Sequence, residues 1–131
     1  MIELSPTQAL ASARRGAAVR WAGGIQRVES RSEGGQCFTL LYAAFDAQGV
    51  VQWTREPAYF RACSRGRYEA QLVQPFTRVV VEGRVGEPGI FLGAPVPTLQ
   101  IDLLHRHSDC LASETDFVAH PECRSGVLTP Q

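Results

Sequence analysis

The sequence predicts an all-β fold with a minor helical part, a small five-stranded and partly open barrel. Three observations predict it. The 131 residues have the length of one domain. Strand-like segments of alternating apolar residues, separated by Gly- and Pro-rich turns, follow in the order β-β-β-α-β-β. The first strand carries two adjacent glycines, as expected where a strand bends to serve both halves of a closing barrel. This order is that of the OB-fold.

The composition is that of a folded globular protein, and the net charge is too small to create a strong electrostatic field around it. Hydrophobic residues make up 44% and charged residues 20%, and the formal net charge is +0. A neutral chain has no general attraction for nucleic acid or for an anionic membrane surface. No apolar run approaches the roughly 20 residues of a membrane helix, and the start of the chain lacks the basic and apolar segments of a signal peptide.

The first two elements are an N-terminal helix and a long strand. Ser5 can cap the helix, Pro6 suits its first position and Gly16 ends it. The strand follows over Val19–Val28 and contains Gly23 and Gly24. Because the strand must close the barrel there, we expect a buried Trp21 and a bend or a positive φ at one of the glycines.

The middle of the chain predicts two further strands and a helix. Residues 36–46 form a strand with apolar residues on both faces. Residues 50–63 form a third strand that Glu56 and Pro57 interrupt, at an edge or a bulge. Residues 67–74 are predicted to be helical, ending before Pro75.

Two further strands are predicted to complete the barrel. Beyond them, apolar and polar residues no longer alternate. Residues 77–83 place Val79 and Val81 inward, and residues 98–105 follow after a Gly/Pro-rich excursion. We therefore assign residues 1–107 to an OB-like barrel domain with its N-terminal helix, and residues 108–131 to an irregular C-terminal tail. The alternative architecture is a β-sandwich with a bulged edge strand.

One family resemblance rests on specific residues. LSP with a short helix, then VRWAGGIQRVE, TLLYAAFDAQG and PVPTLQIDLLHRH, resemble the Slp-type outer-membrane lipoproteins of Gram-negative bacteria over about residues 3–107. The structural motif Trp21, Gly23 and Gly24 is the most distinctive part. At residues 66–70 only a glycine and an acidic residue match the family's GFLDP-like element, and the lipid-bearing cysteine is absent from this sequence.

The resemblance implies a location and a role. It implies a non-enzymatic envelope protein on the periplasmic face of the outer membrane, held by an N-terminal lipid anchor. Its role would be structural or binding and connected with stress, with an unknown protein or small-molecule partner. A native start at Met1 would instead imply a cytoplasmic protein.

The four cysteines allow two disulfides. Cys37 and Cys63 can meet across a hairpin, or both can be buried free thiols. Cys110 and Cys123 favour a short-loop disulfide, as suits an oxidising compartment. Two alternatives stay open in the tail: free thiols, or a zinc site. The residues able to ligate zinc are His105, His107, Cys110, His120 and Cys123.

No catalytic motif stands out in the sequence. A nucleophile elbow, a P-loop, a zinc-protease helix and a dinucleotide fingerprint are all missing. Glu29, Glu69 and Asp102 are interpreted as solvated surface carboxylates. The sequence therefore predicts no catalytic residues, no cofactor and no enzyme.

Aromatic and basic residues on the second and third strands form a candidate ligand face. Its members are Phe38, Tyr42, Trp53, Arg55, Tyr59, Arg61 and Arg67, with Phe60 and Arg65 nearby. OB barrels bind oligonucleotides on these strands through stacking aromatics and a basic groove. The alternative function is therefore a soluble OB-fold binder of single-stranded nucleic acid or of an acidic ligand. The neutral total charge argues against nucleic acid.

Overall fold

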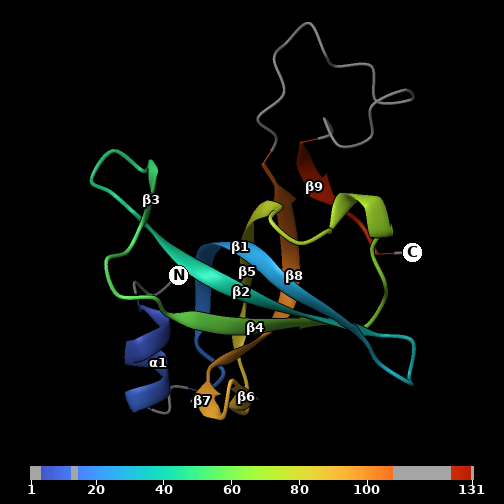
Figure 1. Cartoon of the computed structure of the whole chain (residues 1–131), viewed down its shortest axis with the longest axis horizontal. Coiled ribbons are helices and arrows are strands. Elements are labelled where there is room, and N and C mark those ends of the chain that lie inside the picture. Colours follow the sequence, from blue (N-terminus) through green and yellow to red (C-terminus); the bar gives the residue numbers. More distant parts are fainter. Residues whose placement is uncertain (1–3, 13–14, 108–124, 131) are drawn as a thin grey trace, which may run out of the picture.

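The computed structural model describes residues 4–12, 15–107 and 125–130. The elements in chain order are α1 (Pro6–Ser12), β1 (Ala18–Ser30), β2 (Gln36–Phe45), β3 (Val51–Trp53), β4 (Tyr59–Ser64), the 3₁₀ helix η1 (Ala70–Leu72), β5 (Arg78–Val85), β6 (Gly89–Phe91), β7 (Ala94–Val96), β8 (Thr98–Arg106) and β9 (Gly126–Leu128). Figure 1 shows α1 and the β6–β7 hairpin at one end of the molecule, with β9 away from them.

Five strands close into a barrel. The pairing runs β1-β5-β8-β4-β2, and β2 pairs back onto β1. All these pairs are antiparallel except β4 and β8, which are parallel. The closed ring confirms the OB-like barrel and excludes the alternative β-sandwich. The short strands β3 and β9 extend the sheet at β2 and β8.

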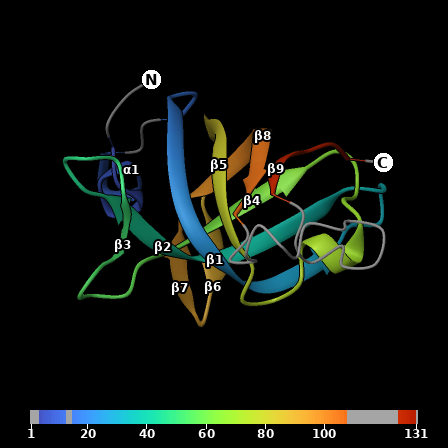
Figure 2. The same cartoon turned by 90° about the horizontal axis from the view of Figure 1, so that it is seen from above.

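The closure occurs at the glycine pair of β1. Residues Ala18–Gly24 pair with β5 and residues Ala22–Ser30 pair with β2, so the strand bonds on both sides over Ala22–Gly24. Figure 2 shows β1 curving strongly as it passes from one neighbour to the other. A Cβ atom on Gly23 would lie 2.6 Å from the carbonyl oxygen of Leu41, so this glycine is required by the close approach of β2.

Of the two alternatives expected at this pair, a bend or a positive φ, the structure shows the bend (Figure 2). Neither Gly23 nor Gly24 has a positive φ, and the irregularity of β1 lies beyond them, as a register shift between Ile25 and Arg27. Glycine is needed here because it has no side chain to block the close approach of β2, and its backbone conformation is one that other residues also adopt. The bulge adds the local bend that the barrel needs.

The N-terminal helix is capped as the sequence predicts. The Ser5 hydroxyl accepts a hydrogen bond from the Gln8 amide at 3.2 Å, and the Gln8 side chain accepts one from the Ser5 amide at 2.9 Å. This reciprocal pair is a capping box. Gly16 follows with a φ of 79°. The helix buries Ala9 against the barrel.

Trp21 lies at the centre of the core, as predicted. It is 2% exposed, and its ring centroid is 5.1 Å from that of Phe60 in an edge-to-face arrangement. Its indole N–H donates to the carbonyl of Leu4, which ties the segment before α1 to β1. The buried polar end is therefore satisfied while the ring fills the barrel.

Several segments differ from the sequence-based expectations. The third strand is two separate strands, β3 and β4, because residues 54–58 form a loop rather than a bulge. The excursion after β5 contains the β6–β7 hairpin, whose turn places Leu92 and Gly93 at positive φ. The tail contains β9, which pairs with the end of β8.

The helix expected over residues 67–74 is a single 3₁₀ turn. Two backbone groups near the ends of this segment hydrogen-bond to the barrel. The Tyr68 amide donates to the Gln36 side chain at 3.0 Å, and the Leu72 carbonyl accepts from the buried Arg106 guanidinium at 2.9 Å. Tertiary hydrogen bonds therefore override a weak helical preference.

Candidate functional site

A row of outward side chains crosses five strands and forms the floor of a groove. The register aligns Trp53 with Ala43, Ala43 with Ala22, Ala22 with Val80, and Val80 with His105. Residues paired across neighbouring strands project from the same face of a sheet. Since the middle of this row is small and its two ends are large, the face is hollowed at its centre.

A second row borders the floor on one side. Arg20 pairs with Glu82, which pairs with Leu103 on β8, and Phe45 pairs with Val51 on β3. The exposed Arg20 guanidinium carbon lies 4.7 Å from the centre of the Phe45 ring. This cation–π contact holds a positive charge at the rim, where it costs little desolvation.

Trp53 forms one wall of the groove. Its indole lies over Gly24, because a Cβ atom on that glycine would be 3.1 Å from the outer edge of the ring. The side chain is 52% exposed. Figure 1 shows the β2–β3 hairpin, which carries Trp53, extending beyond the barrel. The open ring surface is therefore available for stacking.

The far border combines basic and imidazole groups. Arg78 pairs with Gly24, and its carbonyl accepts a hydrogen bond from the His107 amide at 2.9 Å. His105 and His107 both line the groove, which has a volume of about 840 Å³. Small-molecule sites typically occupy about 300 to 1,000 Å³. Among the residues that the structure describes, Arg20, Arg78 and Glu82 are the Arg, Lys, Asp or Glu side chains of the lining.

The predicted ligand face does not form one surface. Phe38 and Phe60 are core residues, and Tyr42 packs its ring against Trp21 with centroids 6.5 Å apart. Burial raises the pKa of the Tyr42 phenol. Tyr59 packs on the ring of Phe91, with centroids 4.7 Å apart.

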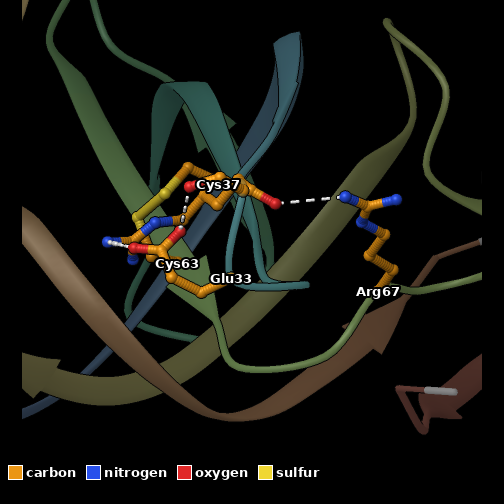
Figure 3. Close-up of polar contacts among 6 residues, drawn as sticks. Glu33, Cys37, Cys63 and Arg67 are labelled. Carbon is orange, nitrogen blue, oxygen red and sulfur yellow. Dashed lines mark hydrogen bonds and ion pairs between the residues drawn. A yellow bond between two sulfur atoms is a disulfide. The ribbon is translucent and has the colours of Figure 1, made fainter.

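Of the predicted face, Trp53 alone lines the groove among the residues that the structure describes. Arg55 and Arg65 are exposed in loops. Arg61 lines a separate pocket of about 250 Å³ beside the turn between β1 and β2. Arg67 reaches the same turn, where it donates to the carbonyl of Arg31 at 3.1 Å, as Figure 3 shows.

Cys37 and Cys63 are joined in a disulfide. They face each other in the register of β2 and β4, with Cα atoms 4.1 Å apart. Figure 3 shows the bond between the two sulfur atoms. Hydrogen bonds from its own backbone and from Ser32 lower the pKa of the Glu33 carboxyl, and the charge of Arg31 adds to the effect.

The tail predictions fall mostly outside the described residues. Cys110, His120 and Cys123 lie there, so neither a second disulfide nor a zinc site is observed or excluded. Within the described ranges, no three His, Cys, Asp or Glu side chains gather closely enough to hold a metal ion. Among the same residues, no helix has the length and apolar character needed to span a bilayer.

The predicted acids are spread over the barrel. Asp102 forms an exposed ion pair with Arg84, with nitrogen and oxygen 3.1 Å apart, and Glu29 lies 3.6 Å from Arg27. Glu69 accepts a hydrogen bond from the neighbouring Gln71 side chain. None of the three lines the groove.

Sequence reasoning missed Arg20, Phe45 and Arg78 as site residues. A signal was present, since Arg20 alternates with the inward residues of β1, and Phe45 shares a strand face with Ala43. The pairing of these strands was needed to bring the residues together.

Comparisons with known proteins find similar solved structures. No family model matches the sequence, and no curated protein matches it. Among solved structures, the small single-stranded DNA-binding protein from Streptomyces coelicolor is similar, with a TM-score of 0.45 and 14% sequence identity. The match covers 70% of this chain and 94% of that one.

Proposed function

We propose that this protein is a non-enzymatic binding module of the bacterial cell envelope. The observation that carries the binding role is the groove on the outer face of the barrel. It joins a floor of small side chains to an exposed indole and two guanidiniums. Sites that bind small molecules combine an apolar concave surface with a few polar groups in this way.

The chemistry of the groove supports binding rather than conversion of a ligand. Its described lining contains no Ser, Thr or Cys side chain that could act as a nucleophile. The guanidiniums of Arg20 and Arg78 offer a ligand N–H donors and no acceptor. His105, His107 and Glu82 also line the groove.

The disulfide supports the envelope location. Such bonds persist in oxidising compartments and are rare in the bacterial cytosol. The Cys37–Cys63 bridge links two adjacent strands of the barrel. The resemblance of VRWAGGIQRVE to outer-membrane lipoproteins supports the same location, on the periplasmic face.

The alternative of a nucleic-acid binder has less support from the charge distribution. Binding a single strand requires a basic groove along which several bases stack. Arg61 and Arg67 lie beside the turn between β1 and β2, where Glu29 and Glu87 line the same pocket as Arg61. The basic residues are therefore divided between two places.

Cell fractionation tests the location. The protein is expressed from its native gene in a Gram-negative host, and cytosolic, periplasmic and outer-membrane fractions are separated. We expect the protein in the envelope fractions, with Cys37 and Cys63 protected from alkylation until reduction. Recovery in the cytosol with both thiols reactive would overturn the proposed location. Fractions from a double Cys37→Ser, Cys63→Ser variant supply the control for alkylation of the other cysteines.

A further inference from the structure

We infer that the tip of the β6–β7 hairpin docks onto a lipid bilayer. The inference deepens the proposed envelope role by naming a surface that the barrel would contact, and it rests on that role for the presence of a membrane nearby. The docking side chains are those of Ile90 and Leu92, the large apolar residues that the hairpin exposes.

The hairpin is apolar along its whole length although it lies at one end of the molecule, as Figure 1 shows. Residues 88–97 read PGIFLGAPVP and contain no charged or hydrogen-bonding side chain. Ile90 is 66% exposed and Leu92 is 83% exposed. Turns that face water usually carry polar residues or glycine, and a contiguous group of exposed apolar side chains marks an interaction surface.

The turn at the tip places a leucine where the backbone disfavours it. Leu92 has a φ of 51° and Gly93 a φ of 77°, the positive values of a two-residue type I′ turn. Asn, Asp and Gly are preferred at the first of these positions, because a bulky side chain is strained in the left-handed conformation. The exposed Leu92 side chain gains little from the barrel in return, so an external apolar surface would explain its presence.

The base of the hairpin fixes the direction of the tip. Phe91 packs on Tyr59 of β4 with ring centroids 4.7 Å apart, and Val96 of β7 is buried. Because Ile90 precedes Phe91 in β6, its side chain points to the opposite face of the hairpin. Its cross-strand partner is Pro95, so these two side chains share the outward face.

The backbone of the hairpin favours lipid over an added protein strand. β6 and β7 pair with each other, so the N–H and C=O groups between them stay bonded when the tip leaves water. At Pro95, β7 has no N–H to donate to a further strand. A partner that adds a strand gains its affinity from such donors, whereas a bilayer needs none.

Charges of both signs lie at the base of the hairpin. Arg15 and Glu87 form an ion pair with nitrogen and oxygen 2.9 Å apart, and Arg61 shares a pocket with Glu29 and Glu87. Exposed ion pairs are weak and are screened by salt. We therefore expect burial of the apolar tip to carry the contact, without a requirement for anionic headgroups.

The position of the hairpin agrees with the proposed anchoring. α1 contacts β7, and Figure 1 shows both at the same end of the molecule. A lipid anchor on the N-terminal side of α1, as the family resemblance implies, would keep this end of the barrel near the bilayer. The hairpin would then be a second membrane contact, and stable membrane attachment commonly requires two.

Flotation with neutral vesicles tests the inference. The oxidised chain of 131 residues, without a lipid anchor, is mixed with phosphatidylcholine vesicles at millimolar lipid. The fraction of protein that floats with the vesicles gives a partition coefficient. We expect measurable partitioning that high salt alters by less than about twofold, because apolar burial does not depend on screened charges.

Two substitutions remove the apolar tip without opposing the local backbone. Leu92→Asn suits the positive φ of the turn, and Ile90→Thr keeps a β-branched residue in the strand. The double variant should therefore be at least as stable as the parent in thermal melts. We expect its partition coefficient to fall about tenfold or more, because two apolar side chains are lost from the contact.

Phe76→Asn is the matched control. Phe76 is 86% exposed and has a φ of 73°, so it resembles Leu92 in exposure and in backbone conformation. It lies beyond the opposite end of β5, whose eight residues span about 24 Å. This variant should bind vesicles as the parent does.

The outcomes are distinguishable. No vesicle binding by the parent, or binding that the double variant retains, would overturn the hairpin as a docking site, and so would an equal loss in Phe76→Asn. A parent that is dimeric by analytical ultracentrifugation, with a monomeric double variant and no vesicle binding, would assign the tip to a second copy of this chain. None of these results bears on the cellular location. Recovery of a vesicle-binding protein in the cytosol would overturn the proposed location and leave the lipid affinity of the tip.

Discussion

Replacing Gly23 by alanine should destabilise the barrel through one steric contact. The added Cβ atom would lie 2.6 Å from the Leu41 carbonyl oxygen and 3.2 Å from both Leu40 Cβ and the Phe60 ring. The nearest of these is backbone of the paired strand, so β1 and β2 must separate where the barrel closes. Overpacking of this kind costs about 1 to 3 kcal/mol. Alanine otherwise favours a strand interior by about 0.5 to 1 kcal/mol over glycine.

The difference between these two effects predicts a net loss of about 1 kcal/mol for Gly23→Ala, measured by urea denaturation of the oxidised protein. Gly24→Ala is the matched control. Its Cβ atom would meet the end of the exposed Trp53 ring at 3.1 Å, a contact that the side chain can relieve by moving. That variant should retain the stability of the parent. If Gly23→Ala proved as stable as Gly24→Ala, the close approach of β2 would not be the reason for the glycine.

Three further predictions concern the core, the disulfide and high pH. Trp21→Ala should lower the free energy of unfolding by about 3 to 5 kcal/mol, measured by urea denaturation, and an unchanged midpoint would remove this ring from the core. Replacing Cys37 and Cys63 by alanine should cost about 3 to 4 kcal/mol for the 26-residue separation, and equal unfolding midpoints before and after this change would contradict the assigned bridge. Burial raises the pKa values of Tyr42 and Tyr68 above the ordinary 10.0. Their stabilising effect is complete below about pH 10 and is lost as the pH rises further, because the unfolded state releases the protons first. Tyr68→Phe should flatten this alkaline loss in thermal melts, and an unaltered slope would refute the assignment.

Local patterns predicted much of the barrel. The capping box at Ser5, the alternation that buries Val79 and Val81, and the burial of Trp21 all follow from short-range physics. Helix caps and strand alternation depend on residues a few positions apart, so a single sequence carries them. The same holds for the order of strands, which indicated an OB-like topology before any pairing was known.

Features that depend on contacts between residues distant in sequence could not be predicted from local patterns. The segment expected to be helical over residues 67–74 forms a single turn, and its backbone is held by Gln36 and Arg106, which are distant in sequence. The β6–β7 hairpin lies in a segment whose glycines and prolines indicated only an irregular excursion. Weak local preferences give way when tertiary contacts offer alternative hydrogen bonds.

The sequence by itself determined the fold class, the residues that close the barrel and the pair of cysteines able to bridge two strands. Only the tertiary structure decided which polar and aromatic side chains share a surface. Phe38 and Tyr42 alternate toward the core, whereas Arg20 and Trp53 line one groove from strands that are far apart in the chain. The physical reason is the register of strand pairing. Alternation along one strand predicts that successive side chains point to opposite faces of the sheet. The pairing of strands decides which side chains of different strands share a face, and where that face forms a groove.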